Sequence, residues 1–356
     1  MAGACNGVSA REAGEALRQG WLEGNPGAQV DLATGSDGSL GLLDAVESVH
    51  GGVREVATVA SATGPVVPAL ILLAGGTAYL QAHDALGHRS DASIESLTHG
   101  SSAGVGQLIA AARDAGARTV VIGASPAATL DAGWGAIASL AGGVPEPFDA
   151  LASAPLTAEL VRAARAALAG LSLVVTTSDL VPAKGLKGPA SALRHQFGPE
   201  TSQMLGQRLA PVVGALEAVG APRQALLAGA APALSSLLGS GSSGGLGLGM
   251  LALGGSIAPG SAWVGNEIGL EQRAHHADLV VVCSEQLDPV EASSGMTAVA
   301  ASAAREAGVA VLALAPSVLL ERRGLAAAGI SSAARLGPGL DGLVAGAVPA
   351  ARGWAW

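Results

Sequence analysis

Short apolar segments alternate with alanine-rich amphipathic segments along most of the chain. Residues 119–122 and 172–176 are almost continuously apolar, as is typical of strands buried on both faces of a parallel sheet. The same pattern predicts further strands at residues 28–33, 278–283 and 309–314. Helices are predicted around them, at residues 9–23, 105–115, 157–169, 265–276 and 295–307. This alternation is typical of an α/β fold built on a parallel sheet.

The stretch between residues 53 and 83 departs from this pattern. It holds three β-rich segments, at residues 53–60, 66–74 and 77–83, separated only by short turns. Turns of this length join antiparallel neighbours, whereas parallel neighbours need a longer crossover. We therefore expect a mixed or antiparallel sheet here.

The expected fold class is α/β, with a parallel three-layer domain of the Rossmann or flavodoxin-like type and a second α/β domain. We assign residues 1–50 and 88–356 to the parallel domain. Residues 51–87 are the seed of the second domain, which we expect also to take part of residues 180–260.

Composition narrows the possible partners. Hydrophobic residues make up 49% and charged residues 13%, so a packed core is expected rather than disorder. The net charge of −9 argues against a nucleic-acid partner, and the aromatic content of 2% leaves few side chains for stacking on bases. The stretch from residue 224 to 266 is uncharged but interrupted by Pro232 and Pro259, so no membrane span is expected.

The compartment is predicted from the cysteines and the first residues. The two cysteines, Cys5 and Cys283, lie far apart in the sequence, and the chain does not open with a basic segment followed by an apolar run. We therefore expect a cytoplasmic protein with both thiols free.

Four segments rich in glycine, serine and alanine lie near the starts of predicted helices. Backbone N–H groups at a helix N-terminus attract phosphate or carboxylate, and glycine lets an anion approach the backbone. A tight turn or close helix packing better explains any one segment taken alone, but the four together favour an anion site. None matches a Walker P-loop or a dinucleotide-binding fingerprint. The segments are residues 33–39, 101–106, 123–129 and 239–249.

Taken in order, seven segments resemble the bacterial glycerate kinase family, which has a two-domain α/β kinase fold. They are ATGSDGS (33–39), SSAGVGQLI (101–109), IGASPAATLDAG (122–133), TSDLVP (177–182), FGPETS (197–202), GSGSSGGLG (239–247) and ADLVVVCSEQLD (277–288). The resemblance implies ATP-dependent phosphorylation of D-glycerate to a phosphoglycerate, with Mg²⁺. The implied partners are thus a small hydroxy acid and a nucleotide.

The resemblance also implies roles for individual residues. Asp179, Ser178 and Asp131 fall on positions that we expect to be catalytic. Each has another reading, since Asp131 would equally cap a helix and Asp179 a turn. The residues expected to bind substrate or phosphate are Ser36, Asp37, Ser125, Thr129, Gly244, Gly245, Glu285, Asp288 and Lys184.

The chain departs from the family pattern at charged positions. Cys5, Thr201 and Met296 stand where the family has lysines, and Ser178 stands on an aspartate position. Phosphoryl transfer depends on cations that stabilise the developing charge. We therefore expect activity to be weakened or lost, unless Lys184 or Lys187 supplies the missing charge for a kinase of shifted substrate. The alternative is a catalytically silent paralogue that binds a small hydroxy acid or nucleotide as a sensor or partner.

Overall fold

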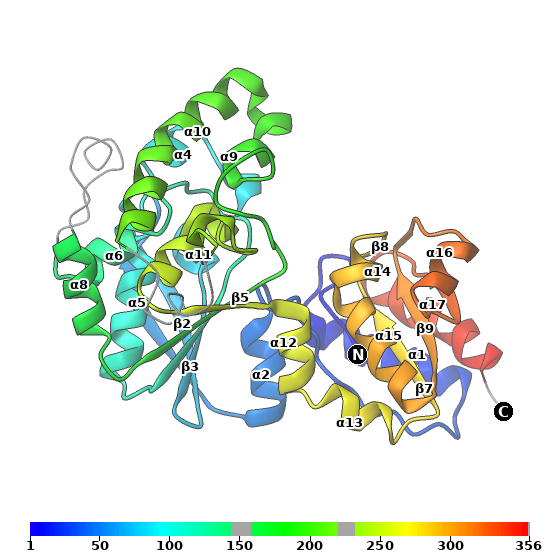
Figure 1. The fold of residues 1–356 in the computed structure, drawn as a ribbon. Helices are drawn as coiled ribbons and strands as arrows, with labels where there is room; N and C mark the ends of the chain where they lie inside the picture. Colours follow the sequence, from blue (N-terminus) through cyan, green and yellow to red (C-terminus); the bar gives the residue numbers. More distant parts are fainter. Residues whose placement is uncertain (144–157, 220–231, 355–356) are drawn as a thin grey trace. The chain divides into compact units, whose positions relative to one another are not determined.

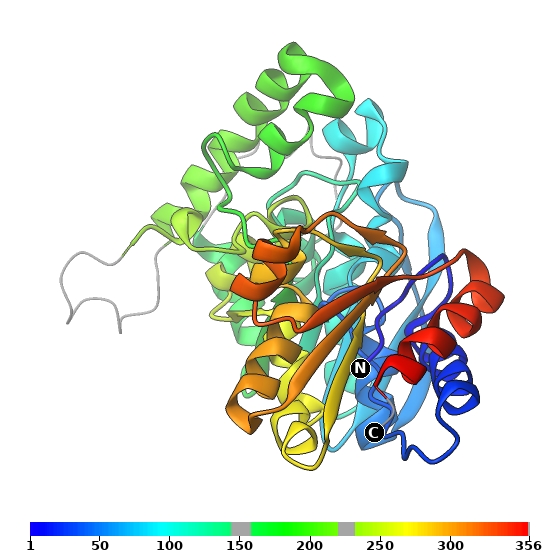
Figure 2. The ribbon, with the colours of Figure 1, turned by 90° about the vertical axis from the view of Figure 1, so that its right-hand side faces the viewer.

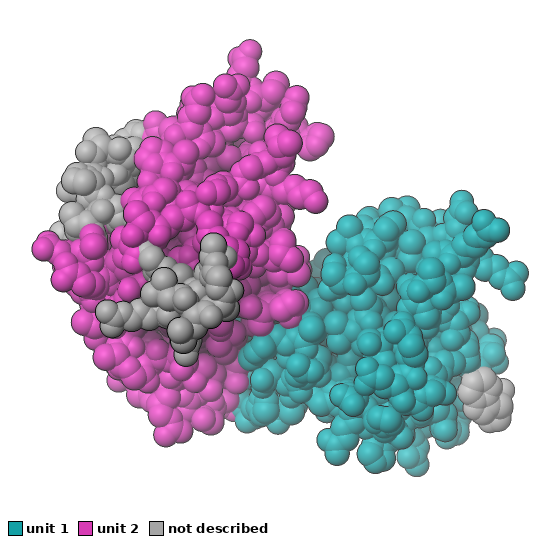
Figure 3. Space-filling model, viewed as in Figure 1, with its two compact units in different colours: residues 1–51, 260–356 teal, residues 52–259 magenta. Residues whose placement is uncertain are grey.

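The computed structural model of the protein describes residues 1–143, 158–219 and 232–354. Two compact units make up the chain (Figure 3). Unit 1 comprises residues 1–51 and 260–356, and unit 2 is the continuous segment 52–259. The sequence analysis assigned residues 88–179 to the unit of the chain ends. In the structure they belong with the hairpins, because the strands of residues 53–81 and the later parallel strands form one sheet.

Unit 2 is built on a six-stranded mixed sheet with the strands in chain order. Antiparallel pairing joins β1 to β2 and β2 to β3, and parallel pairing continues from β3 to β6. The apolar runs of the parallel strands are buried, as their sequence predicted. The strands are β1 (Val53–Ala60), β2 (Val66–Ala74), β3 (Thr77–Gln81), β4 (Thr119–Gly123), β5 (Ser172–Thr177) and β6 (Ser256–Pro259).

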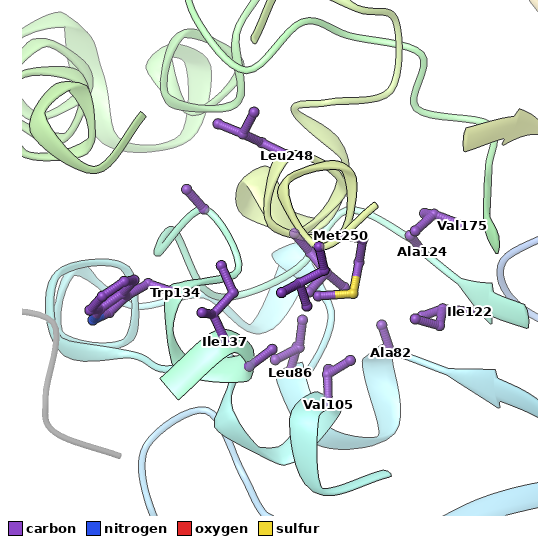
Figure 4. Packing of buried hydrophobic residues seen from close by; sticks show 14 of the residues in the cluster. Ala82, Leu86, Val105, Ile122, Ala124, Trp134, Ile137, Val175, Leu248 and Met250 are labelled. Atoms are coloured by element: carbon purple, nitrogen blue, oxygen red, sulfur yellow. The ribbon is translucent and has the colours of Figure 1, made fainter. Parts of the chain in front are cut away.

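Helices of unit 2 pack on this sheet and on one another. The alanine- and glycine-rich α5 (Ala103–Asp114) packs against β1, β2 and β4, and α11 (Ser242–Ala252) packs against β5 and β6. Met250 of α11 lies in the centre of the apolar cluster, near Ile137 of α6 (Figure 4). At one end of the unit, α10 packs against α4 and α9 (Figure 1). The other helices are α3 (His83–Leu86), η1 (Arg89–Asp91), α4 (Ile94–His99), α6 (Trp134–Leu140), α8 (Ala158–Ala167), α9 (Pro189–Ala192), α10 (Arg194–Ala218) and η3 (Leu234–Ser236).

Unit 1 is a parallel three-layer unit. Its sheet has the order β11-β9-β7, all parallel, and single bridges from Ala2 to Cys283 and to Thr34 extend it beyond β7. A two-stranded parallel pair, β8 with β10, lies beside it. The strands are β7 (Leu279–Cys283), β8 (Gln286–Leu287), β9 (Ala310–Ala315), β10 (Ser317–Val318) and β11 (Ser332–Arg335).

The two faces of this sheet are covered by different helices (Figure 2). α1 and α17 pack together on one face, and their apolar residues join β7 and β9 in a single cluster. α15 packs against β7 and β9, and α12 and α13 pack against α15. The helices are α1 (Ala10–Gly24), α2 (Leu42–His50), α12 (Gly260–Glu267), α13 (Leu270–Ala274), α14 (Glu291–Ser294), α15 (Met296–Ala307), α16 (Arg322–Ala327) and α17 (Gly339–Gly353).

The expected α/β class is confirmed, and two expected elements differ. Residues 28–33 do not form a strand. Beyond β7 the sheet continues only as single bridges, from Cys283 to Ala2 and from Ala2 to Thr34. The helix predicted at residues 265–276 is two helices, because Gly269 adopts a left-handed conformation with φ of 64° and ends the first. Cys5 and Cys283 are buried free thiols in one apolar cluster. No helix among the described residues is long and apolar enough to cross a membrane.

Candidate functional site

The carboxyl ends of β3, β4 and β5 meet at one edge of the unit 2 sheet. The pairing aligns Gln81 of β3 with Gly123 of β4, and Gly123 with Thr176 of β5. Loops that leave the carboxyl ends of neighbouring parallel strands are the usual place for ligands in α/β proteins. We call this place the carboxyl edge.

The loop that follows β4, residues 123–129, is held tightly to β5. The Ala124 N–H donates to the carbonyl of Thr176 at 2.8 Å, and the Thr177 hydroxyl donates to the carbonyl of Ala124 at 2.7 Å. Ser125 and Thr129 are buried, yet their hydroxyl oxygens have no hydrogen-bond partner within the described parts of the chain. A buried hydroxyl without a partner costs about 1–3 kcal/mol, which a ligand or water that reached it would relieve.

The start of α11 lies against the same loop. Ser243, Gly244 and Gly245 all have positive φ angles, and the Ser243 hydroxyl donates to the carbonyl of Ser125. A Cβ on Gly244 would lie 1.9 Å from the carbonyl oxygen of Thr129. The glycines expected to bind phosphate thus let two backbones approach, which is the packing alternative that the sequence left open. The hydroxyl of Ser242 is buried and is also without a partner among the described residues.

Asp131 is an interior side chain. Its carboxylate is 1% exposed and accepts hydrogen bonds from the Ser102 N–H at 2.7 Å and the Ser102 hydroxyl at 2.8 Å. It also accepts from the N–H groups of Gly133 and Gly135, both at 3.0 Å. Burial raises the pKa of this carboxyl, and the four hydrogen bonds oppose that rise. The structure therefore places Asp131 as an anchor of the first turns of α5 and α6.

Asp179 lies at the carboxyl edge, two residues after β5. Its N–H donates to the Thr177 hydroxyl at 3.0 Å. Its side chain is partly buried and accepts no hydrogen bond within the described part of the chain. Burial raises the pKa of the carboxyl, and the positive charge of Arg89 lowers it again. The neighbouring Ser178 is exposed.

Arg89 reaches this place from a segment that the sequence analysis did not single out. Its N–H donates to the carbonyl of Pro126 at 2.9 Å, and the preceding His88 bridges to Ala127. The segment after α3 is thus fixed on the loop after β4. The sequence signal was present, since a histidine and an arginine shortly after a strand are candidates for its carboxyl edge.

His83 also follows β3 directly and was not predicted. Its Nε2 lies 3.2 Å from Oδ1 of Asp84, whose other oxygen accepts the N–H of Leu70 at 3.0 Å. Burial lowers the pKa of His83, against the charge of Asp84. The imidazole is therefore mainly neutral at pH 7.

Lys184 does not offer a free positive charge to a ligand. Its Nζ pairs with both carboxylate oxygens of Glu217 at 3.0 Å. Burial of Glu217 works against its ionisation, but hydrogen bonds from Ser235 and Lys184 outweigh this and lower the pKa of Glu217. The charge of Lys184 is thus already matched.

Two of the predicted residues in unit 1 shape the loop after Thr34. The hydroxyl of Ser36 donates to the carbonyl of Leu40 at 2.7 Å, and Asp37 accepts the Ser39 N–H at 2.9 Å. These hydrogen bonds close local turns.

The other two unit 1 residues follow β7. Glu285 accepts the Asn6 N–H at 2.6 Å. Asp288 accepts the Glu291 N–H at 2.8 Å, and this hydrogen bond is the main cause of its lowered pKa. Glu291, which the sequence analysis missed, is mostly buried with a pKa raised by burial, and Asp288 and Asp37 add to the rise.

The carboxyl edge thus combines an acid, a nearby cation and unpartnered hydroxyls, which suit a polar anionic ligand. No group of three or more His, Cys, Asp or Glu side chains able to hold a metal ion is found among the described residues. Mg²⁺ in kinases is commonly held by one or two carboxylates together with substrate phosphates, so such a group is not required.

Comparison with known proteins gives consistent matches along the chain. Residues 5–345 match the model of the glycerate kinase family. Two uncharacterized proteins, Mb2228c of Mycobacterium bovis and MT2261 of Mycobacterium tuberculosis, are each 31% identical over 332 residues, covering 92% of this chain and 80% of theirs.

A solved structure described as "putative glycerate kinase 2" from Salmonella typhimurium LT2 has the same fold. It superposes with a TM-score of 0.76 at 22% identity, covering 97% of this chain and 93% of the other. The order of motifs, the two α/β units and the family match agree, and the chain belongs to the glycerate kinase family.

Proposed function

We propose that this protein transfers a phosphoryl group from ATP to a hydroxyl of D-glycerate or a closely related small hydroxy acid. Membership of the family supports the reaction class. The observation that carries the proposal is a partly buried Asp179 carboxyl at the carboxyl edge with the charge of Arg89 nearby. An ATP-dependent reaction of this kind and two free thiols fit a cytoplasmic location.

Asp179 is the proposed proton acceptor for the substrate hydroxyl. In phosphoryl transfer the protein mainly positions the reactants, and an acidic side chain accepts the proton of the attacking hydroxyl. A carboxylate whose pKa is raised by burial is a stronger base than an exposed one. Its side chain has no competing hydrogen bond among the described residues, so it is free to accept one from substrate.

The loop after β4 and the start of α11 are the proposed binding place of the nucleotide phosphates. The hydroxyls of Ser125, Thr129 and Ser242 are donors without partners in the described chain, and the N-terminus of a helix favours an anion. These residues therefore fit a phosphate group. When bound, ATP with Mg²⁺ supplies the transferable phosphoryl group and the main cationic charge.

We expect the reaction to be slow. The family lysines are replaced by Cys5, Thr201 and Met296, and Lys184 is held by Glu217. Loss of one group that stabilises charge in the transition state typically lowers the rate about 10²–10³-fold.

The test is an assay of ADP release with ATP, Mg²⁺ and D-glycerate, run on the wild-type protein and on Asp179→Asn. We expect slow, glycerate-dependent turnover that falls by about 10²–10⁴-fold in Asp179→Asn, because the proton acceptor is lost. Glu159→Gln, which removes an exposed acid from α8 of the same unit, should retain the wild-type rate.

The ion pair between Lys184 and Glu217 favours a second candidate, a binding protein without catalysis, because it removes the nearest replacement lysine. That candidate predicts that titration calorimetry detects binding of D-glycerate or ATP, while the assay detects no release of ADP. Such a result would exclude the kinase proposal.

A further inference from the structure

Arg89 is fixed by its backbone, while its side-chain charge is left unmatched. Its N–H donates to Pro126, and its carbonyl accepts from the Gln196 side chain at 3.5 Å. Two segments, the loop after β4 and the start of α10, therefore set its position. The guanidinium itself makes no ion pair or hydrogen bond within the described parts of the chain.

The nearest counter-charge is Asp179, and the two side chains do not bond directly. The field of Arg89 acts on the Asp179 carboxyl, but they form no ion pair within 4.0 Å. Opposite charges that serve stability alone commonly meet in a direct hydrogen-bonded pair. Two partly buried charges of opposite sign at the carboxyl edge of a sheet, neither bonded to another described residue, are instead typical of a ligand site.

We propose that Arg89 binds the carboxylate of the substrate and so selects hydroxy acids over neutral polyols. This inference rests on the proposed function for the identity of the acceptor substrate. In a hydroxy acid such as glycerate, the carboxylate carbon is one or two bonds from a carbon that bears a hydroxyl. One molecule can therefore contact both Arg89 and Asp179. Arg89 takes the carboxylate through its planar fork, and Asp179 takes the hydroxyl.

A nucleotide phosphate fits Arg89 less well than a carboxylate does. A triphosphate at Arg89 would place several negative charges beside the Asp179 carboxylate, on which Arg89 is the only cation that acts among the described residues. The unpartnered hydroxyls of Ser125, Thr129 and Ser242 and the start of α11 offer the phosphates other donors at the same carboxyl edge.

The experiment is titration calorimetry of the full-length protein with D-glycerate, glycolate, L-lactate, glycerol and ATP with Mg²⁺. We expect Arg89→Gln to weaken binding of D-glycerate about 10–100-fold, the usual effect of losing a hydrogen bond to a charged group. Arg89→Lys should lose less affinity for D-glycerate, because lysine keeps the positive charge but not the planar guanidinium group. Binding of ATP should change less than twofold, and discrimination between D-glycerate and glycerol should collapse in Arg89→Gln.

Arg162→Gln is the matched control, since Arg162 is an exposed arginine of α8 whose Nε donates to the carbonyl of Ala158 in its own helix. Circular dichroism of each variant establishes that it is folded. If Arg89→Gln leaves carboxylate binding intact, or weakens ATP instead, the assignment of Arg89 is overturned.

The outcomes separate this inference from the proposed function. Wild-type turnover of D-glycerate with unchanged affinity in Arg89→Gln would keep the function and reject the role of Arg89. Binding of glycolate or L-lactate that requires Arg89, without turnover of D-glycerate, would keep Arg89 and reject the function. Binding of no carboxylate by the wild-type protein would overturn both.

Discussion

Asp131 and Asp179 show how two acids of one unit take different roles from their surroundings. Asp131 is buried, and its carboxylate oxygens accept hydrogen bonds from three N–H groups and a hydroxyl. Asp179 is partly buried, and its carboxylate accepts no hydrogen bond from the described residues. Burial raises the pKa of both, but only Asp179 has an arginine close enough to lower it. Proton transfer to a substrate is therefore argued for Asp179 alone.

The pH profile of kcat/KM tests this difference. The base must be ionised, so activity should fall as the pH drops through the pKa of Asp179, which burial places above the ordinary aspartate value. Arg89→Gln removes the charge that lowers this pKa, so the acid limb should move to higher pH. Arg89→Lys should leave the limb near that of the wild type. An acid limb at the same pH in all three proteins would show that Asp179 is not the group that titrates.

Much of the fold was predictable from sequence because local pattern decided it. The two strands Val53–Ala60 and Val66–Ala74 were predicted at their observed bounds, since apolar periodicity and a short turn both define them. The residues around the carboxyl edge were harder. Arg89 is placed near Asp179 by the hydrogen bond of its N–H to Pro126 and by the bridge from His88 to Ala127, and the sequence does not reveal such long-range pairing. The ion pair of Lys184 with Glu217 was hidden for the same reason.

Among the elements, α11 owes its position to glycine rather than to apolar contacts alone. Its first turn runs through three left-handed residues, which a side chain other than glycine adopts at a cost of about 1–2 kcal/mol. Gly244 and Gly245 also bring it to the backbone of the loop after β4 and of Ala132. The helix start and the loop are therefore one packed assembly, and a change in either would displace the hydroxyls of the other.

Gly244→Ala should destabilise unit 2 by about 3 kcal/mol or more, because it adds overpacking against Thr129 to the backbone strain. Gly254→Ala is the matched control. Gly254 also has a positive φ, of 94°, but a Cβ there would meet nothing within 4 Å, so only the strain of about 1–2 kcal/mol is expected. Urea unfolding followed by circular dichroism measures both. Equal losses in the two variants would show that the loop yields to the added methyl group.

At the scale of the whole molecule, one large apolar cluster of the described residues lies in unit 2 and a smaller one lies in unit 1. The larger cluster lies entirely within residues 52–259, from Val59 to Leu253. The smaller one combines the first residues and α1 with β7, β9 and α17 from the far end of the sequence. Unit 2 is thus a continuous segment inserted between the two parts of unit 1.

A fragment of residues 52–259 should fold by itself, because it contains its whole sheet and the apolar cluster from Val59 to Leu253. We expect a cooperative thermal transition by circular dichroism. A fragment of residues 1–51 should show none, since α1 lacks α17 and β7 to pack against. A non-cooperative melt of the longer fragment would mean that unit 2 depends on unit 1.

The insertion of unit 2 also fixes an order of events during protein synthesis. Unit 1 begins first on the ribosome, yet β7, β9 and α17 emerge only after the last strand of unit 2. At about 5–20 residues per second, α1 waits on the order of 10–70 s for its partners. During that time its apolar face is open to chaperones, while the inserted unit completes its own sheet.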